Sequence, residues 1–227
     1  MNIGTNAKKI INNEIKIVQG LFTTDESKTF GGQVWELFSR FTWQAVQTST
    51  GSAIALVANN LTMVDKVDHY GGATTVTYYG DWEAFAMGSY IHGGKELAAD
   101  PKNSLFQHEY GHYLQSQEFG PFYLQRVGIP SIMSKEKYHN FHNVEQDANI
   151  RALNYFMNKR GSLTLKDWKK QDNPIIGFDW IDKPGYQNNN LSILKKRTRL
   201  NPFDLFMGSD IIVGGLINGL YYRPKKY

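Results

Sequence analysis

The sequence contains no cysteine, and this absence excludes several classes of protein. None of its 227 residues is Cys, and only six are His and seven are Pro. A protein without cysteine cannot have a disulfide scaffold, a thiolate-bound zinc ion or a cysteine nucleophile. The lack of cysteine does not fix the cellular compartment, because exported bacterial proteins often lack it too.

Long apolar segments are also missing. No stretch of about 18 or more uncharged apolar residues occurs, and residues 211–220, the best candidate, are too few and too glycine-rich to span a bilayer. Residues 1–13 are polar, and no apolar segment with a small-residue cleavage site follows them. We therefore expect a soluble protein with no membrane span and no Sec signal peptide, which would need a specialised secretion route to be exported.

The residues that are present suit one globular domain. A hydrophobic content of 41% and an aromatic content of 14% can form a sizeable core. We predict an N-terminal extension over residues 1–30 and a single domain over residues 31–227. The net charge is +4, and much of the excess lies in residues 195–199 and 223–226. No nucleic-acid-binding motif accompanies these clusters, so a solvated basic face is the favoured interpretation.

The apolar periodicity in the first half of the chain changes from helical to strand-like. It predicts helices around residues 10–18 and over residues 33–61. Residues 74–79 and 82–92 are rich in β-branched and aromatic side chains or alternate in polarity. Because a Gly-Asp pair joins these two runs, they predict an antiparallel hairpin, with a shorter strand around residues 63–67.

The second half of the chain contains two clear helical patterns. The first covers residues 105–119 and the second residues 143–159, and glycine follows each of them. Helical pieces are also expected at residues 191–197 and 202–218. No internal repeat or linker divides the chain.

An H-E-x-x-H motif, His-Glu-Tyr-Gly-His, occupies residues 108–112 of the first of these helices. His108 and His112 lie one helical turn apart on one face, so both imidazoles can bind the same ion. Glu109 can reach a water on that ion without being a ligand, which makes it the candidate general base. The motif favours a Zn²⁺-dependent hydrolase over the alternative of two surface histidines on an amphipathic helix.

A zinc site of this kind needs a third protein ligand, and several residues are candidates. No His follows the motif before the helix-ending glycine, which excludes a third histidine on the same segment. Glu145, near the start of the second helix, is the preferred ligand. His139 and His142 just before this helix, and Asp147 two residues after Glu145, are the competing candidates.

Neighbours of Glu145 support this assignment. Ala148 and Ala152 share its helix face, and their small side chains would allow two helices to approach closely. Asn149 shares that face as well and could hydrogen-bond a ligating His, fixing its tautomer. For stabilisation of an oxyanion, the candidates are Tyr113, Tyr138 and the two histidines before the helix.

With these residues identified, the chain resembles a known layout. The pair H-E-Y-G-H and E-Q-D-A-N-x-R-A is similar to the gluzincin metallopeptidases, in which a second helix carries the glutamate ligand. The closer resemblance is to the ImmA/IrrE-type metallopeptidases, with Glu145 in the ligand position and Asn149 in the Asn position. This resemblance covers two helices only.

A longer resemblance covers most of residues 20–155. It relates the chain to the C-terminal domains of Rhs/YD-repeat proteins from Bacteroidetes. It rests on the Glu145 helix and on residues 38–44, 67–73, 107–116 and 128–131. In such proteins the variable C-terminal domain is often a toxin released from a shell, which implies a delivered effector and a neutralising immunity protein. The repeat shell is missing from this sequence, so the chain would be a free-standing relative or an excised domain.

Together these features predict an α+β fold of the zincin type. A small antiparallel sheet would lie beside an active-site helix at residues 104–118 and a ligand helix at residues 143–159. The expected activity is hydrolysis of a peptide or protein that could pair with the strand near residues 84–90. The alternatives are a target-binding effector with a structural zinc site, closed by one of the two histidines before the second helix, and a nucleic-acid-binding module at residues 195–226.

Overall fold

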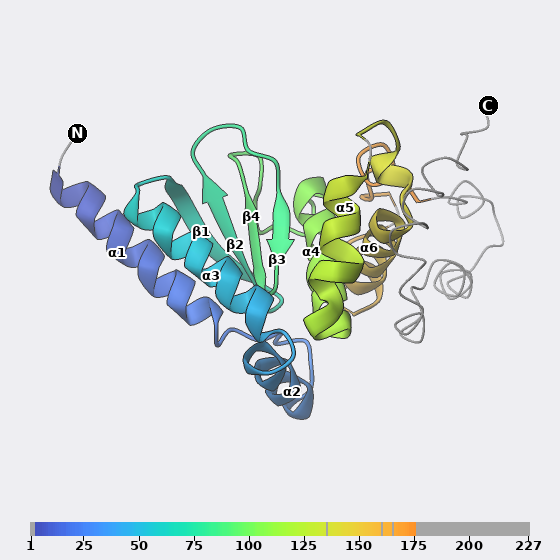
Figure 1. Ribbon diagram of the computed structural model, residues 1–227, viewed down its shortest axis with the longest axis horizontal. Helices are drawn as coiled ribbons and strands as arrows, with labels where there is room; N and C mark the ends of the chain where they lie inside the picture. Colours follow the sequence, from blue (N-terminus) through green and yellow to red (C-terminus); the bar gives the residue numbers. More distant parts are fainter. Residues whose placement is uncertain (1–2, 135, 160, 165, 176–227) are drawn as a thin grey trace.

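The structure, a computed structural model, describes residues 3–134, 136–159, 161–164 and 166–175 of the chain. These residues form an α+β fold with six α-helices and one four-stranded sheet, which confirms the predicted fold class at this level. The α-helices are α1 (Ile3–Gly20), α2 (Phe30–Phe41), α3 (Ala45–Asn60), α4 (Ser104–Phe119), α5 (Ile129–Met133) and α6 (Asn143–Asn154). Figure 1 shows α1 and α3 on one side of the sheet and α4 and α6 on the other.

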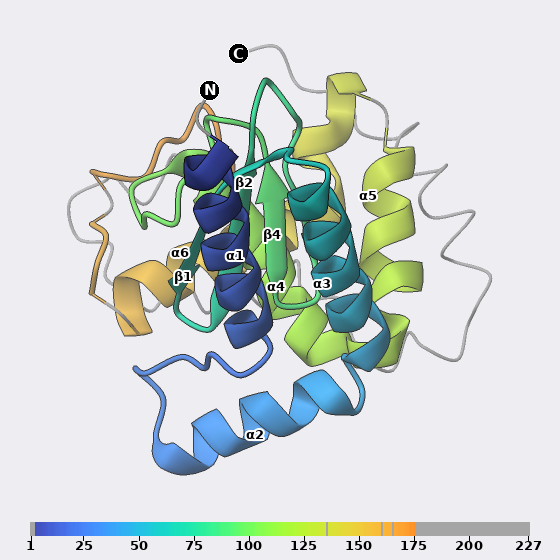
Figure 2. The same ribbon diagram turned by 90° about the vertical axis from the view of Figure 1, so that its left-hand side faces the viewer.

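Helices α1 and α3 form an outer layer that covers one face of the sheet (Figure 2). Ile17 of α1 and Ala55 of α3 are fully buried and pack with Val67 and Val76 of the sheet in one apolar core. Helix α1 falls within the segment 1–30 that was expected to be an extension. The domain boundary at residue 30 stays a prediction.

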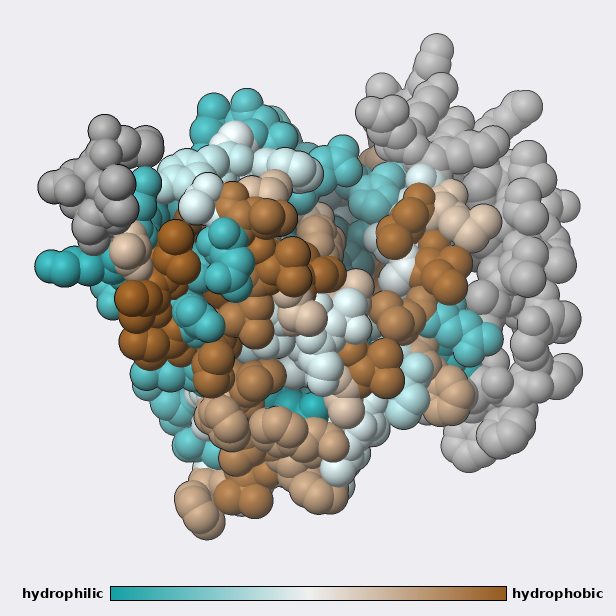
Figure 3. Space-filling model, turned by 60° about the vertical axis from the view of Figure 1, so that its left-hand side comes forward, coloured by the Kyte–Doolittle hydropathy of each residue, from teal (hydrophilic) through white to brown (hydrophobic). Residues whose placement is uncertain are grey.

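The outer faces of these two helices are also apolar. Exposed apolar side chains gather over them in the space-filling view (Figure 3), namely Ile11, Ile15, Val18, Ile54, Val57 and Leu61. Even so, no helix in the described part of the chain combines the length and the apolar character needed to cross a membrane. In the described part of the chain, helix α1 therefore has exposed apolar side chains in addition to those that pack against the sheet.

The single helix expected over residues 33–61 is divided in two. Helix α2 ends at Phe41, and Thr42 leaves the helical conformation with φ −121° and ψ −98°. The Gln44 side chain then donates a hydrogen bond to Ser39 Oγ at 2.5 Å, which holds the turn. Because apolar residues continue through this turn, the periodicity does not reveal it.

The strands are β1 (Val64–Tyr70), β2 (Ala73–Tyr78), β3 (Phe85–Met87) and β4 (Tyr90–Gly93), in spatial order β1-β2-β4-β3. The predicted hairpin between residues 74–79 and 82–92 is wrong, because β2 and β4 pair in parallel. A hairpin instead joins β1 to β2 through Gly71 and Gly72, whose φ angles of +55° and +83° suit a two-residue turn. A further turn at Gly88, with φ +63°, separates β3 from β4. The sheet is therefore mixed rather than antiparallel, and β3 is an edge strand.

The two helices expected to contain the site lie close to their predicted bounds. Helix α4 begins after Asn103, whose side chain accepts a hydrogen bond from the Phe106 amide at 2.8 Å, and it ends at Gly120 with φ +51°. Helix α6 begins after His142, and a π-helical segment over residues 155–159 follows it. The capping residue and the terminal glycine explain why these bounds could be predicted.

Some predictions concern residues that the structure does not describe. These are the helical pieces at residues 191–197 and 202–218, the short apolar run 211–220 and the basic module 195–226. They stay predictions.

Candidate metal centre

Helices α4 and α6 approach closely at Gly111, inside the H-E-x-x-H motif. A Cβ atom at this position would fall well inside the contact distance of the Ala148 carbonyl oxygen on α6. Ala148 and Ala152 are both fully buried, as expected for small residues between two helices. Since packed backbones leave no room for a larger side chain, Gly111 sets the distance between the two helices.

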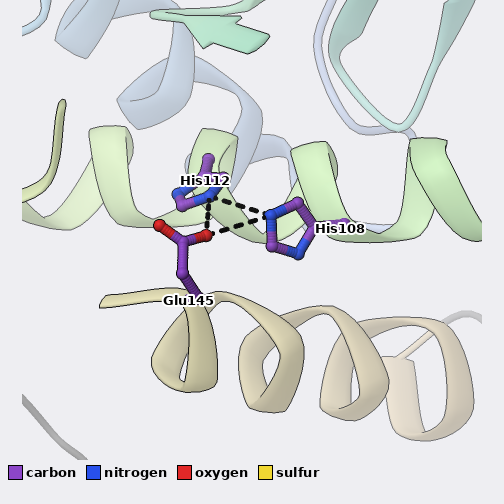
Figure 4. A group of neighbouring side chains, drawn as sticks. All are labelled: His108, His112 and Glu145. Carbon is purple, nitrogen blue, oxygen red and sulfur yellow. Dashed lines mark hydrogen bonds and ion pairs between the residues drawn. The ribbon is translucent and has the colours of Figure 1, made fainter. Parts of the chain in front are cut away.

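This approach brings the three predicted ligands together. His108 and His112 from α4 and Glu145 from α6 point toward one another in Figure 4. Glu145 Oε2 lies 3.1 Å from His108 Nε2 and 3.0 Å from His112 Nε2, and the two Nε2 atoms are 3.2 Å apart. Ligand atoms of a tetrahedral zinc site with bonds of about 2.0–2.1 Å are about 3.3 Å apart. The three atoms therefore form a triangle of the size that one metal ion requires.

Two amide side chains determine which nitrogen of each imidazole faces this triangle. His108 Nδ1 lies 2.8 Å from Asn149 Oδ1, and the Asn149 amide nitrogen donates to the Pro174 carbonyl at 3.1 Å. His112 Nδ1 lies 2.7 Å from Gln115 Oε1. Because an amide oxygen can only accept, each Nδ1 must be the donor and each Nε2 is free to bind a metal. The predicted role of Asn149 as a partner of a ligating His agrees with this geometry.

The charges in the centre shift the pKa values of its members. Burial opposes the charge on His112, but the Glu145 and Glu109 carboxylates raise its pKa to about 9. Burial likewise opposes ionisation of Glu145, yet the histidines hold its pKa well below the usual value. Burial raises the pKa of Glu109, against the effect of the same histidines. The metal-free centre therefore holds protons that a bound cation would displace.

Two buried carboxylate oxygens at the centre have no hydrogen-bond partner among the described residues. They are Glu145 Oε1 and Glu109 Oε2, and Glu109 is only 5% exposed. A buried carboxylate without partners is costly, and a metal ion or a water that it orders can satisfy it. Two imidazole nitrogens and one carboxylate oxygen are also donor types that zinc accepts, so the residues fit such an ion.

The competing histidines lie outside the triangle. His142 caps α6, since its Nδ1 accepts a hydrogen bond from the Val144 amide at 3.4 Å. His139 Nε2 lies 3.7 Å from Glu145 Oε2 and does not join the group of converging ligand atoms. Within the described residues, the centre thus has three candidate protein ligands and a histidine at its edge.

The remaining candidates take other roles. The Asp147 carboxylate accepts a hydrogen bond from Arg151 Nε at 2.5 Å and is not among the converging ligand atoms. The Tyr113 hydroxyl donates to Glu36 and is therefore engaged away from the triangle. The side chain of Tyr138 lies outside the described part of the structure. These placements leave Glu145 as the candidate for the third ligand.

The opposite face of α4 is anchored by a buried polar network that the sequence did not reveal. The Tyr110 hydroxyl donates to the Gly71 carbonyl at 2.6 Å. Arg40, itself 1% exposed, donates to Glu36 at 2.9 Å and to the Gly72 carbonyl at 2.5 Å. One indication was available in the sequence. Tyr110 and Tyr113 are three residues apart, and two such residues share a helix face. This network holds α4 against the β1–β2 turn.

Comparison of the chain with protein-family models, curated proteins and solved structures gave no match. The residues and their geometry are therefore what supports a metal centre.

Proposed function

We propose that this protein is a zinc-dependent peptidase of the gluzincin type. His108, His112 and Glu145 would hold the ion, and Glu109 would act as the general base. The observation that supports this most directly is the triangle of ligand atoms with 3.0–3.2 Å sides, in which both imidazoles present Nε2. A zincin-like fold, with the motif helix between the sheet and the ligand helix, belongs to the same proposal.

The chemistry assigns a distinct task to each group. A bound zinc ion would lower the pKa of a coordinated water towards ~7 and polarise the substrate carbonyl. Glu109 would accept the proton of the attacking water and deliver it to the amine that leaves. Burial raises the pKa of Glu109, which makes its carboxylate a stronger base once it is ionised. His139, at the edge of the centre, is a candidate to donate a hydrogen bond to the developing oxyanion.

The edge strand β3 supports a peptide as the substrate. Among the described residues it pairs with β4 on one side only, and α4 packs against it. An extended peptide can add to such an edge through main-chain hydrogen bonds. The Ala86 carbonyl of β3 accepts a hydrogen bond from the Tyr123 hydroxyl at 3.1 Å, so a peptide amide would compete with Tyr123 for this carbonyl.

An open metal position favours catalysis over a structural zinc site. Structural sites are closed by four protein ligands, whereas catalytic sites keep three and leave one position for water or substrate. In the part of the chain that the structure describes, three groups converge. The alternative of a target-binding domain with a structural zinc would require His139 to move in as a fourth ligand.

Two measurements test the proposal. Zinc content by mass spectrometry is expected to be one ion per chain in the wild type and sharply reduced in Glu145→Ala. Glu109→Gln is expected to keep its zinc and to hydrolyse a mixed peptide library about 10²- to 10⁴-fold more slowly than the wild type. Glu96→Gln, at an exposed position, is the matched control. Wild-type hydrolysis by Glu109→Gln would show that the mechanism is wrong.

The resemblance to Rhs-associated domains extends the proposal to a delivered toxin with an immunity protein as partner. Expression of the wild type inside bacteria is then expected to arrest growth, and expression of Glu109→Gln is not. Equal growth of the two strains at equal protein level would remove the support for a toxin whose action is catalytic.

A further inference from the structure

Gln115 is a fully buried residue on α4, one turn beyond His112, and both ends of its carboxamide are engaged. Its Oε1 lies 2.7 Å from His112 Nδ1. Its Nε2 donates to the Val144 carbonyl at 2.9 Å and to Asp147 Oδ2 at 2.8 Å. Both of these partners belong to α6, so Gln115 connects a metal ligand on one helix to the backbone and side chains of the other.

The orientation of this carboxamide is determined by its surroundings. A carbonyl oxygen and a carboxylate oxygen can only accept, so the group facing Val144 and Asp147 must be the amide nitrogen. A reversed carboxamide would place its oxygen against both acceptor oxygens and remove the hydrogen bond that each of them receives from Gln115. Gln115 Oε1 therefore faces His112, and His112 must donate from Nδ1.

Asp147 is held in turn by a cation. Arg151 Nε donates to Asp147 Oδ2 at 2.5 Å, and Arg151 Nη1 donates to Glu118 Oε2 at 2.6 Å. The side chains of Asp147 and Arg151 are 5% and 13% exposed, so water screens this pair weakly. These residues also line a cleft of about 810 Å³ between α2, α4 and α6. The hydrogen bonds of Arg151, Asp147 and Gln115 thus connect that cleft to the metal centre.

We propose that Gln115, Asp147 and Arg151 are positioning residues that hold His112 as its Nδ1–H tautomer and thereby set the metal affinity of the centre. Zinc binds a neutral imidazole through the nitrogen that lacks the proton, so the wrong tautomer must be converted before the ion can bind. This inference rests on the proposed metal centre and not on the identity of the substrate. His108 has a shorter connection of the same type within the described residues, since the Asn149 amide donates to the Pro174 carbonyl.

The first test is zinc affinity, measured by competition with a chelator. Gln115→Met, which keeps the side-chain length and removes both polar ends, is expected to bind zinc about 10- to 100-fold more weakly than the wild type. Gln117→Met, on the same helix and without contact to His112, is the matched control and is expected to bind normally. Asp147→Leu is expected to weaken binding, whereas Asp147→Asn, which keeps an oxygen acceptor, is expected to recover most of it.

The second test reads the tautomer directly, by nitrogen-15 NMR of the histidine ring in the zinc-loaded wild type. His112 is expected to have its proton on Nδ1 and its metal bond at Nε2. The opposite pattern would overturn the inference even if Gln115→Met does not fold. Normal zinc affinity in Gln115→Met would overturn it as well, while leaving the metal centre intact. A wild type that binds no zinc would overturn the centre itself together with this inference.

Discussion

The two faces of α4 differ in how completely their polar groups are satisfied. On the rear face, the hydroxyls of Tyr110 and Tyr113 donate to the Gly71 carbonyl and to Glu36, within a buried network. On the front face, the Nε2 atoms of His108 and His112 converge on each other and on the Glu145 carboxylate. One helix therefore has a face whose two tyrosine hydroxyls are satisfied within the protein and a face whose converging ligand atoms could hold a cation.

Because of this difference, the residues that determine stability are expected to differ from those that determine metal binding. A buried polar atom without a partner costs about 1–3 kcal/mol, and the front face leaves two carboxylate oxygens in that state among the described residues. The rear face contributes the hydrogen bonds that keep α4 in place despite this cost. We therefore expect substitutions on the rear to change the free energy of unfolding and substitutions on the front to change metal affinity.

The largest effect is expected at Arg40, at the centre of the rear network. Arg40→Met removes the cation from a pair in which Arg40 and Glu36 are 0% and 1% exposed. Loss of one partner of such a buried pair lowers the free energy of unfolding by about 3–5 kcal/mol. Urea denaturation of the metal-free protein measures this loss. The folded fraction is expected to bind zinc with wild-type affinity.

Lys9→Met is the matched control for Arg40→Met. Lys9 also pairs with a carboxylate, Asp65, but the two side chains are 39% and 45% exposed. Exposed pairs contribute about 0–1 kcal/mol, so this variant is expected to unfold nearly as the wild type does. If both variants lost the same unfolding free energy, the buried rear network would contribute no more to stability than an exposed ion pair does. If Arg40→Met lowered zinc affinity without lowering the free energy of unfolding, the rear face would act on metal binding rather than on stability.

The next effect is expected at Gly111, which lies between the two faces. Gly111→Ala would favour an isolated helix by about 1 kcal/mol, but its methyl group meets the Ala148 backbone. Overpacking of this kind costs about 1–3 kcal/mol and would separate α4 from α6. Both the unfolding free energy and the zinc affinity are therefore expected to fall, although no ligand is changed.

Gly31→Ala provides the control for Gly111→Ala, because a Cβ atom at Gly31 of α2 meets nothing within 4 Å. It is expected to leave zinc affinity unchanged and stability equal or slightly higher. If Gly111→Ala bound zinc as tightly as Gly31→Ala, the close approach of the helices would not be what assembles the centre.

The front face was more predictable from the sequence than the rear. His108, Glu109 and His112 follow a spacing whose geometry on a helix is known, and Glu145 follows from the need for a third ligand near small residues. Gln115 was not found, because its role depends on the α6 carbonyl and carboxylate that surround it. Such partners are set by tertiary packing, so no spacing of residues in the sequence indicates them.

The sheet shows the same limit. The sequence contains Gly71-Gly72 and Gly80-Asp81, and both pairs are suitable for hairpin turns. Local pattern favoured the second pair, whereas the structure uses the first and places β2 parallel to β4. Pairing of non-adjacent segments is decided by burial on both faces of β2, all of whose residues are buried. A continuous buried strand therefore carries little information about its neighbours.

A smaller effect, expected from the charges of the front face, is on pH dependence. The Glu145 and Glu109 carboxylates raise the pKa of metal-free His112 to about 9, so it is protonated at neutral pH. Zinc must displace that proton, and its apparent affinity is therefore expected to rise with pH below about 9. The change is about tenfold per pH unit for each proton released, or about 1.4 kcal/mol. Chelator competition between pH 6 and 8 measures this slope, and a flat profile would contradict the assignment.

The smallest effect is expected at Tyr110, which lies on the rear face of α4, across the helix from His108 and His112. Tyr110→Phe keeps the aromatic packing and removes the hydroxyl that donates to the Gly71 carbonyl at 2.6 Å. A net loss of about 1 kcal/mol in unfolding free energy is expected, as for one neutral hydrogen bond. Zinc affinity is expected to stay at the wild-type value, because Tyr110 occupies the motif without facing the metal. A change in zinc affinity larger than the change in stability would show that the turn at Gly71 acts on the centre through α4, and that the two faces are coupled.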